Sequence, residues 1–117
     1  MEKSESIKEL ATALARAQGL LQPAKKDQSN PFFKSTYADL ASVWEVARKP
    51  LSDNGLSVTQ TTAIDGGRLM LDTTLLHLSG EWLSGRIEIN PVKPDPQGVG
   101  SAISYARRYA LSAILGI

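Results

Sequence analysis

The stretch that decides the fold is residues 56–89, LSVTQTTAIDGGRLMLDTTLLHLSGEWLSGRIEI. Residues 56–64 are rich in β-branched types, and the Asp-Gly-Gly sequence at 65–67 is typical of a tight hairpin turn. A second strand is expected at about 68–78, and a Ser-Gly turn should lead from it into a third strand at about 81–89. The segment therefore predicts a three-stranded antiparallel meander.

The third of these strands shows the clearest alternation of side chains. One face should carry Leu83, Ile87 and Ile89. The other face should carry the intervening residues Trp82, Ser84, Arg86 and Glu88. A sheet with one apolar face packs that face on a core and leaves the other to water or to a partner.

Helical spacing precedes the meander. Ser6 and Glu9 match a capping box, and apolar residues then recur at helical intervals until Pro23 ends the helix. Residues 22–35 are expected to form a loop. A second helix should begin near Thr36, be kinked or divided at Pro50, and end at Asn54-Gly55.

A long helix is expected after the meander. Asp95-Pro96 is typical of an N-cap followed by proline at the first helical position, and the helix should run to roughly Leu115. The order α-α-β-β-β-α predicts an α+β fold, with the three-stranded meander packed on the long C-terminal helix. We expect residues 1–117 to form one domain.

The last helix carries apolar residues on two sides. The face expected to pack on the sheet comprises Val99, Ala102, Ile103, Ala106, Tyr109, Ala110, Ala113 and Ile114. Leu111 and Leu115 lie off this face, near Arg108, which indicates a second packing surface. A neighbouring subunit and further C-terminal sequence explain this second surface equally well.

The first turns of the last helix contain Gly98 and Gly100. Glycine at these positions permits either close approach by a phosphate or, more often, tight packing against another part of the fold.

Composition limits the classes of function. The 13 Lys and Arg nearly balance 12 Asp and Glu, for a net charge of +1, so any polyanion site must come from the arrangement of charges. Cysteine is absent, which removes disulfides and cysteine-ligated zinc. No signal peptide and no apolar run of about 20 residues occurs, so we expect a cytoplasmic protein.

Catalytic motifs are not evident in the chain. The single histidine, His77, has no partner nearby in sequence, and the phosphate-binding loop of ATPases is missing. The candidate carboxylates Asp39, Asp72, Glu88 and Asp95 are scattered, unlike those of a two-metal nuclease. We therefore expect no enzyme, no cofactor and no metal site.

Two groups of residues interleave aromatic rings with cations, the combination that holds single-stranded nucleic acid. The first comprises Phe32, Phe33, Lys34 and Tyr37, and the second Tyr105, Arg107, Arg108 and Tyr109. Each group alone is weak evidence, because Tyr37 and Tyr109 also suit a core.

Three ordered blocks carry a resemblance to a known family. Residues 95–117, DPQGVGSAISYARRYALSAILGI, resemble the hallmark segment of the ERF (essential recombination function) family of phage single-strand annealing proteins. NPFFKSTYADLASVWEVARKPLSDNGLSV at 30–58 and LLHLSGEWLSG at 75–85 resemble that family's first block and central hairpin. The resemblance spans about residues 7–117. Relatives in that family continue beyond the position of Ile117, so the resemblance implies that residues 1–117 are a DNA-annealing core domain without its C-terminal tail.

The resemblance implies ATP-independent binding and annealing of single-stranded DNA by a homo-oligomer, as a ring or filament, in the host cell's cytoplasm. It also implies a cooperating exonuclease or a single-strand-binding protein. The DNA-binding residues implied by the matching motifs are Lys34, Tyr37, Gln97, Tyr105, Arg107 and Arg108. Arg107 and Arg108 would contact phosphates or bridge subunits. The alternatives are a non-enzymatic oligomeric scaffold with no DNA role and a metal-dependent nuclease.

Overall fold

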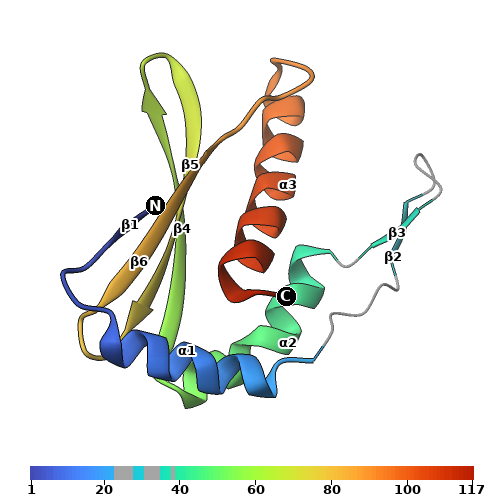
Figure 1. The fold of residues 1–117 in the computed structure, drawn as a ribbon. Coiled ribbons are helices and arrows are strands. Elements are labelled where there is room, and N and C mark those ends of the chain that lie inside the picture. The colour runs from blue at the N-terminus through green and yellow to red at the C-terminus, as the bar shows by residue number, and fades with distance from the viewer. Residues whose placement is uncertain (23–27, 31–34, 38) are drawn as a thin grey trace.

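A computed structural model describes residues 1–22, 28–30, 35–37 and 39–117, the second and third of these segments as backbone only. The helices are α1 (Lys8–Leu20), α2 (Leu40–Asp53) and α3 (Pro96–Leu115). The strands are β1 (Glu2–Lys3), β2 (Gln28–Asn30), β3 (Ser35–Tyr37), β4 (Leu56–Asp65), β5 (Arg68–His77) and β6 (Trp82–Glu88). The α+β class and the β-β-β-α order are confirmed. Figure 1 shows α3 running along one face of the large sheet, with α1 crossing its lower end.

The large sheet is antiparallel, with strand order β1-β6-β5-β4. Its β4–β5 register is unbroken from the pair Leu56–His77 to the pair Asp65–Arg68. Gly66 and Gly67 make the turn with φ of 57° and 78°, values that glycine adopts without steric cost. The predicted meander is therefore confirmed, and β1 adds a short edge strand that the sequence did not indicate.

The helix-facing side of the sheet contains the core. Leu71 and Leu75 of β5 are 1% and 0% exposed. On β6 the predicted face is confirmed at Leu83, which packs against the core, while Ile89 just beyond the strand is buried. Ile87 shares this face but stays 40% exposed, because α3 leaves it partly uncovered.

The starts of α1 and α2 differ from the prediction. At the start of α1 the Ser6 Oγ accepts from the Lys8 amide at 3.3 Å, as a capping residue does. The Leu10 amide donates to Glu81 Oε1 at 2.8 Å, so a residue from the β5–β6 turn adds a cap that the sequence did not indicate. Asp39, rather than Thr36, caps α2, since its Oδ1 accepts from the Ser42 amide at 2.8 Å. Thr36, the predicted helix start, lies in β3, and β2 lies within the segment 22–35 that was predicted as a loop.

Pro50 does not divide α2, which runs as one helix to Asp53. The proline stands in the last turn, where a missing amide removes little of the ladder. The predicted end is confirmed, with Asn54 as C-cap and Gly55 at φ 69°.

Leu111 and Leu115 correct the prediction for the last helix. Both are 0% exposed and belong to the core, together with α1 and α2 residues such as Leu10 and Val43. The N-terminal half of α3 packs on the sheet, and α1 and α2 cover a second side of its C-terminal half, which a single helical face could not reveal. Tyr109, placed on the core face by its spacing, is instead 59% exposed. Neither a neighbouring subunit nor further sequence is needed to bury the two leucines.

Helices of the length and apolarity that a bilayer span requires do not occur among the described residues.

Candidate nucleic-acid interface

Two tyrosines and an arginine form a cluster on the outer side of α3. The rings of Tyr105 and Tyr109, one turn apart, lie 6.4 Å between centroids at an interplanar angle of 24°. The Arg108 Cζ lies 4.3 Å from the Tyr109 centroid and 5.7 Å from that of Tyr105. We call these three residues the Tyr–Arg cluster. The cluster combines a cation, which can bind a phosphate, with partly exposed rings, on which a base of a single strand can stack.

Arg107 lies in different surroundings from its neighbour. Its Nε donates to Gln60 Oε1 of β4 at 3.2 Å, and Gln60 Nε2 donates back to the Arg107 carbonyl at 3.0 Å. The same Nε2 lies 3.1 Å from Oγ1 of Thr73, which is 2% exposed. Arg107 is thus joined to the sheet, whereas Arg108 contacts the rings of the Tyr–Arg cluster. Successive helical residues point about 100° apart, which accounts for the separation.

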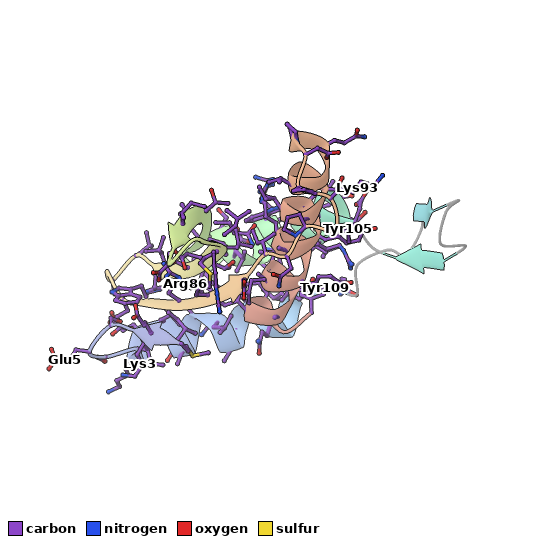
Figure 2. The ribbon with its side chains drawn as sticks, turned by 90° about the horizontal axis from the view of Figure 1, so that it is seen from above. Lys3, Glu5, Arg86, Lys93, Tyr105 and Tyr109 are labelled. Atoms are coloured by element: carbon purple, nitrogen blue, oxygen red, sulfur yellow. The ribbon has the colours of Figure 1, made fainter. Side chains whose placement is uncertain are left out.

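Gln97 lies in the first turn of α3 and lines a groove of about 590 Å³ between α3, the end of β6 and the loop that joins them. Tyr105 and Tyr109 line the same groove, and Figure 2 shows these two rings and Lys93 along α3. The structure therefore brings Gln97 and the Tyr–Arg cluster to one side of the helix. A second hollow, of about 360 Å³, lies on the other side of Tyr105 and is lined by Arg108 and the start of α2.

Residues just before α3 contact its first turn, where a bound phosphate would otherwise lie. Asp95 accepts from the Gly98 amide at 2.6 Å, so one of the amides that a phosphate would use has a partner. A Cβ at position 98 would clash with the Lys93 carbonyl oxygen, which shows that Gly98 serves tight packing. At Gly100 nothing lies within 4 Å of such a Cβ.

Two predicted residues lie in the segment before α2. Lys34 falls outside the described residues, as do Phe32 and Phe33. Tyr37 ends β3, where its backbone pairs with Gln28 of β2. In Figure 1 this small β2–β3 sheet projects beyond α2, away from the large sheet.

One arginine–ring pair was not among the predicted residues. The Arg48 Cζ lies 5.4 Å from the Trp44 ring centroid on α2. Their i, i+4 spacing within a predicted helix was the signal that could have identified the pair. It adds an arginine–ring pair on α2 to the one on α3.

Arg86 is held by acidic neighbours on the outer face of the sheet. Its Nε and Nη2 donate to the two carboxylate oxygens of Asp72 at 2.7 and 3.0 Å, and its Nη1 donates to Asp65 at 2.7 Å. The hydrogen bonds from Arg86 hold the pKa of Asp72 below its usual value, and Asp72 raises the pKa of Arg86. A cation already shared by two carboxylates is a poor phosphate ligand.

The described residues contain no group of three His, Asp or Glu side chains able to hold a metal ion. The His77 Nδ1 lies 2.9 Å from the hydroxyl of Ser79 in the adjoining turn, which orients the ring locally.

A family model described as the ERF superfamily matches residues 10–117. No curated protein and no solved structure matches the chain.

Proposed function

Because this chain belongs to the ERF superfamily, we propose that it binds single-stranded DNA and anneals complementary strands without ATP, during phage homologous recombination. The match covers α3 and the meander, and therefore includes the Tyr–Arg cluster. We further propose that it acts as a homo-oligomer, a ring or filament, in the cytoplasm of the bacterial host. A cooperating exonuclease or single-strand-binding protein would supply or protect the strands.

The observation that carries the proposal is the position of Arg108 over two partly exposed tyrosine rings. A guanidinium binds a phosphate, while the neighbouring ring offers an apolar surface to a sugar or a base of any sequence. Gln97 can add a hydrogen bond along the same helix. Lys34 and Tyr37 are proposed as contacts from the preceding segment.

Arg107 is assigned a different part. Its bonds to Gln60 make it a positioning residue that fixes α3 on the sheet and so sets the direction of Arg108. The two adjacent arginines therefore have different roles in this proposal.

Annealing requires no bond to be made or broken in the protein. The protein has to neutralise phosphates, so that two strands can approach, and to leave the hydrogen-bonding edges of the bases accessible. Phosphate neutralisation releases counterions, so binding should weaken steeply as salt rises. With a net charge of only +1, this effect must come from a local cluster on each subunit, repeated through the oligomer.

The test is a fluorescence-anisotropy titration with single- and double-stranded oligonucleotides at two salt concentrations, followed by an annealing assay without ATP. The wild type should prefer single strands and accelerate pairing. Arg108→Gln should lose about tenfold in affinity, the equivalent of one charged hydrogen bond of roughly 1.4 kcal/mol. Arg16→Gln, at an exposed position on α1, is the matched control and should bind normally. Oligomers that ignore both oligonucleotides would favour the scaffold alternative, and magnesium-dependent cleavage would favour a nuclease.

A further inference from the structure

The strand β4 is an open sheet edge without protection. It pairs with β5 on one side, and no other strand of the described chain pairs with its second side. Residues 56–64 contain neither charge nor proline, and the unbroken register leaves no bulge. Proteins that remain monomeric usually block such an edge with lysine, proline or a bulge. The edge of β4 is therefore suited to pairing with another strand.

The opposite edge of the sheet is open over part of its length. β1 pairs with Leu83 and Ser84 of β6, and the Ser4 amide donates to the Trp82 carbonyl at 2.9 Å. Beyond that point no described strand pairs with the outer side of β6 from Gly85 to Glu88. Each copy thus has two different sheet edges, β4 and the end of β6, at which a strand of another copy could pair.

The groove beside the β6 edge is apolar and slightly acidic. Ile87 is 40% exposed and Val92 is 99% exposed, and both line the groove together with the two tyrosines. Its charged lining residues are Lys93 against Glu88 and Asp95, an excess of one negative charge. That charge opposes a phosphate backbone, so the part of the groove at Ile87 and Val92 favours a protein segment over DNA.

The β4 edge carries an exposed apolar side chain, Ile64, in the row of the sheet that leads to the groove. Ile64 is 71% exposed and shares the helix-facing side of β4 with Leu56 and Val58. It pairs with Leu69, whose carbonyl accepts from the Ile89 amide at 2.8 Å, so Ile64 and Ile89 lie in one row across the sheet. A second sheet aligned with the first would bring Ile64 close to the groove at Ile87.

We infer that the β4 edge of one copy pairs with the Gly85–Glu88 edge of a second copy and places Ile64 against the groove. Both strands are antiparallel to β5, so the new pair is parallel when helices of both copies lie on one side of the sheet. This one contact then covers both exposed apolar side chains, Ile64 of one copy and Ile87 of the other. Such a head-to-tail contact repeats into a ring or filament, whereas β4–β4 pairing stops at two copies and leaves the groove open. The inference rests on the proposed homo-oligomer and gives its interface.

Cysteine cross-linking tests the contact, because the natural chain has no cysteine. Within one copy β5 separates Ile64 from Ile87, and two strand spacings amount to about 9.6 Å, too far for a disulfide. We expect Ile64→Cys mixed with Ile87→Cys to form cross-linked pairs on a non-reducing gel, and the double variant to form a ladder. Ile64→Cys mixed with Ala11→Cys, on the exposed side of α1, is the control and should stay uncross-linked.

A second variant separates assembly from DNA binding. Ile64→Lys puts a charge at the proposed contact on a surface position, so the fold should persist by circular dichroism while light scattering shows single chains. Uncross-linked mixtures, together with oligomers of normal size for Ile64→Lys, would overturn the inference. Cross-links of Ile64→Cys with itself alone would overturn it in favour of β4–β4 pairing. If either result overturns the interface but the protein still prefers single-stranded DNA, the proposed function stands. If the oligomers stay intact but do not bind DNA, the proposed function is refuted and the interface is not.

Discussion

Gln60 and Arg107 hold each other across the space between β4 and α3, each as donor and as acceptor. The Arg107 Nε donates to Gln60 Oε1 at 3.2 Å, and the Gln60 Nε2 donates to the Arg107 carbonyl at 3.0 Å. One amide side chain thus contacts both the side chain and the backbone of a helical residue. This fixes both the rotation and the height of α3 relative to the sheet, and with them the direction of the Tyr–Arg cluster.

Removal of the Arg107 side-chain donor should destabilise the fold more than removal of Arg108. In Arg107→Gln the Gln60 oxygen loses its charged partner in a half-buried site, and we expect the free energy of unfolding to fall by about 1–3 kcal/mol. Arg108→Gln should lower it by less than about 1 kcal/mol, the value of a partly exposed cation–ring contact. Urea denaturation measures both. Equal losses would show that the Gln60 bond contributes nothing to stability.

The salt dependence of DNA binding should separate the same two arginines. For single strands each phosphate contact adds roughly 0.7 to the slope of log affinity against log salt concentration. Arg108→Gln should reduce the slope by about that amount per subunit contact, while folded Arg107→Gln should keep it. A reduced slope for Arg107→Gln with an unchanged one for Arg108→Gln would reverse the assignment.

The features of the fold that the sequence predicted are local ones. The turn at Gly66 and Gly67 follows from two residues that tolerate positive φ, and Asp95-Pro96 starts α3 as its cap chemistry requires. The strand β1 was missed because two residues carry no periodic pattern. Its pairing depends on residues about 80 positions away, such as Ser84 and Leu83.

The candidate site was predicted in composition but not in arrangement. Helical spacing directs Arg107 and Arg108 about 100° apart, yet it could not show that Gln60 would reach the former. It also misplaced Leu111 and Tyr109, because the prediction assumed one partner, the sheet, while α1 and α2 pack on a second side. Tertiary contacts of this kind leave no periodic trace in the helix itself. The contributions of Lys34, Tyr37 and Gln97 stay predictions.

Glu81 offers a test of a long-range helix cap. Its Oε1 accepts from the Leu10 amide at 2.8 Å, which links the β5–β6 turn to the first turn of α1. We expect Glu81→Ala to lower the free energy of unfolding by about 1 kcal/mol, a typical cost of losing an N-terminal cap. Glu81→Gln keeps an acceptor oxygen and should cost less. Thermal unfolding of the two variants decides the matter, and identical losses would mean that the acceptor at this position is unimportant.

The Asp72–Arg86 pair makes stability depend on acid pH in a predictable direction. Hydrogen bonds from Arg86 lower the pKa of Asp72 in the folded protein. A group with a lowered folded pKa contributes its stability above the unfolded pKa of about 3.9 and loses it as the pH falls through the folded value. Stability should therefore decline as the pH drops from about 5 towards 2, because the protonated acid no longer accepts both bonds.

The variant Asp72→Asn removes that titration. Its free energy of unfolding should be lower than the wild-type value at neutral pH, and the difference should shrink as the pH falls below about 4, where the wild-type carboxylate is protonated as well. Asp53→Asn is the matched control, since Asp53 pairs with Lys49 on an exposed helical surface, at 51% and 84% exposure. Its unfolding profile should stay parallel to that of the wild type. Urea denaturation at a series of pH values measures all three proteins, and a difference between wild type and Asp72→Asn that grows with acidity would show that protonated Asp72 still stabilises the sheet.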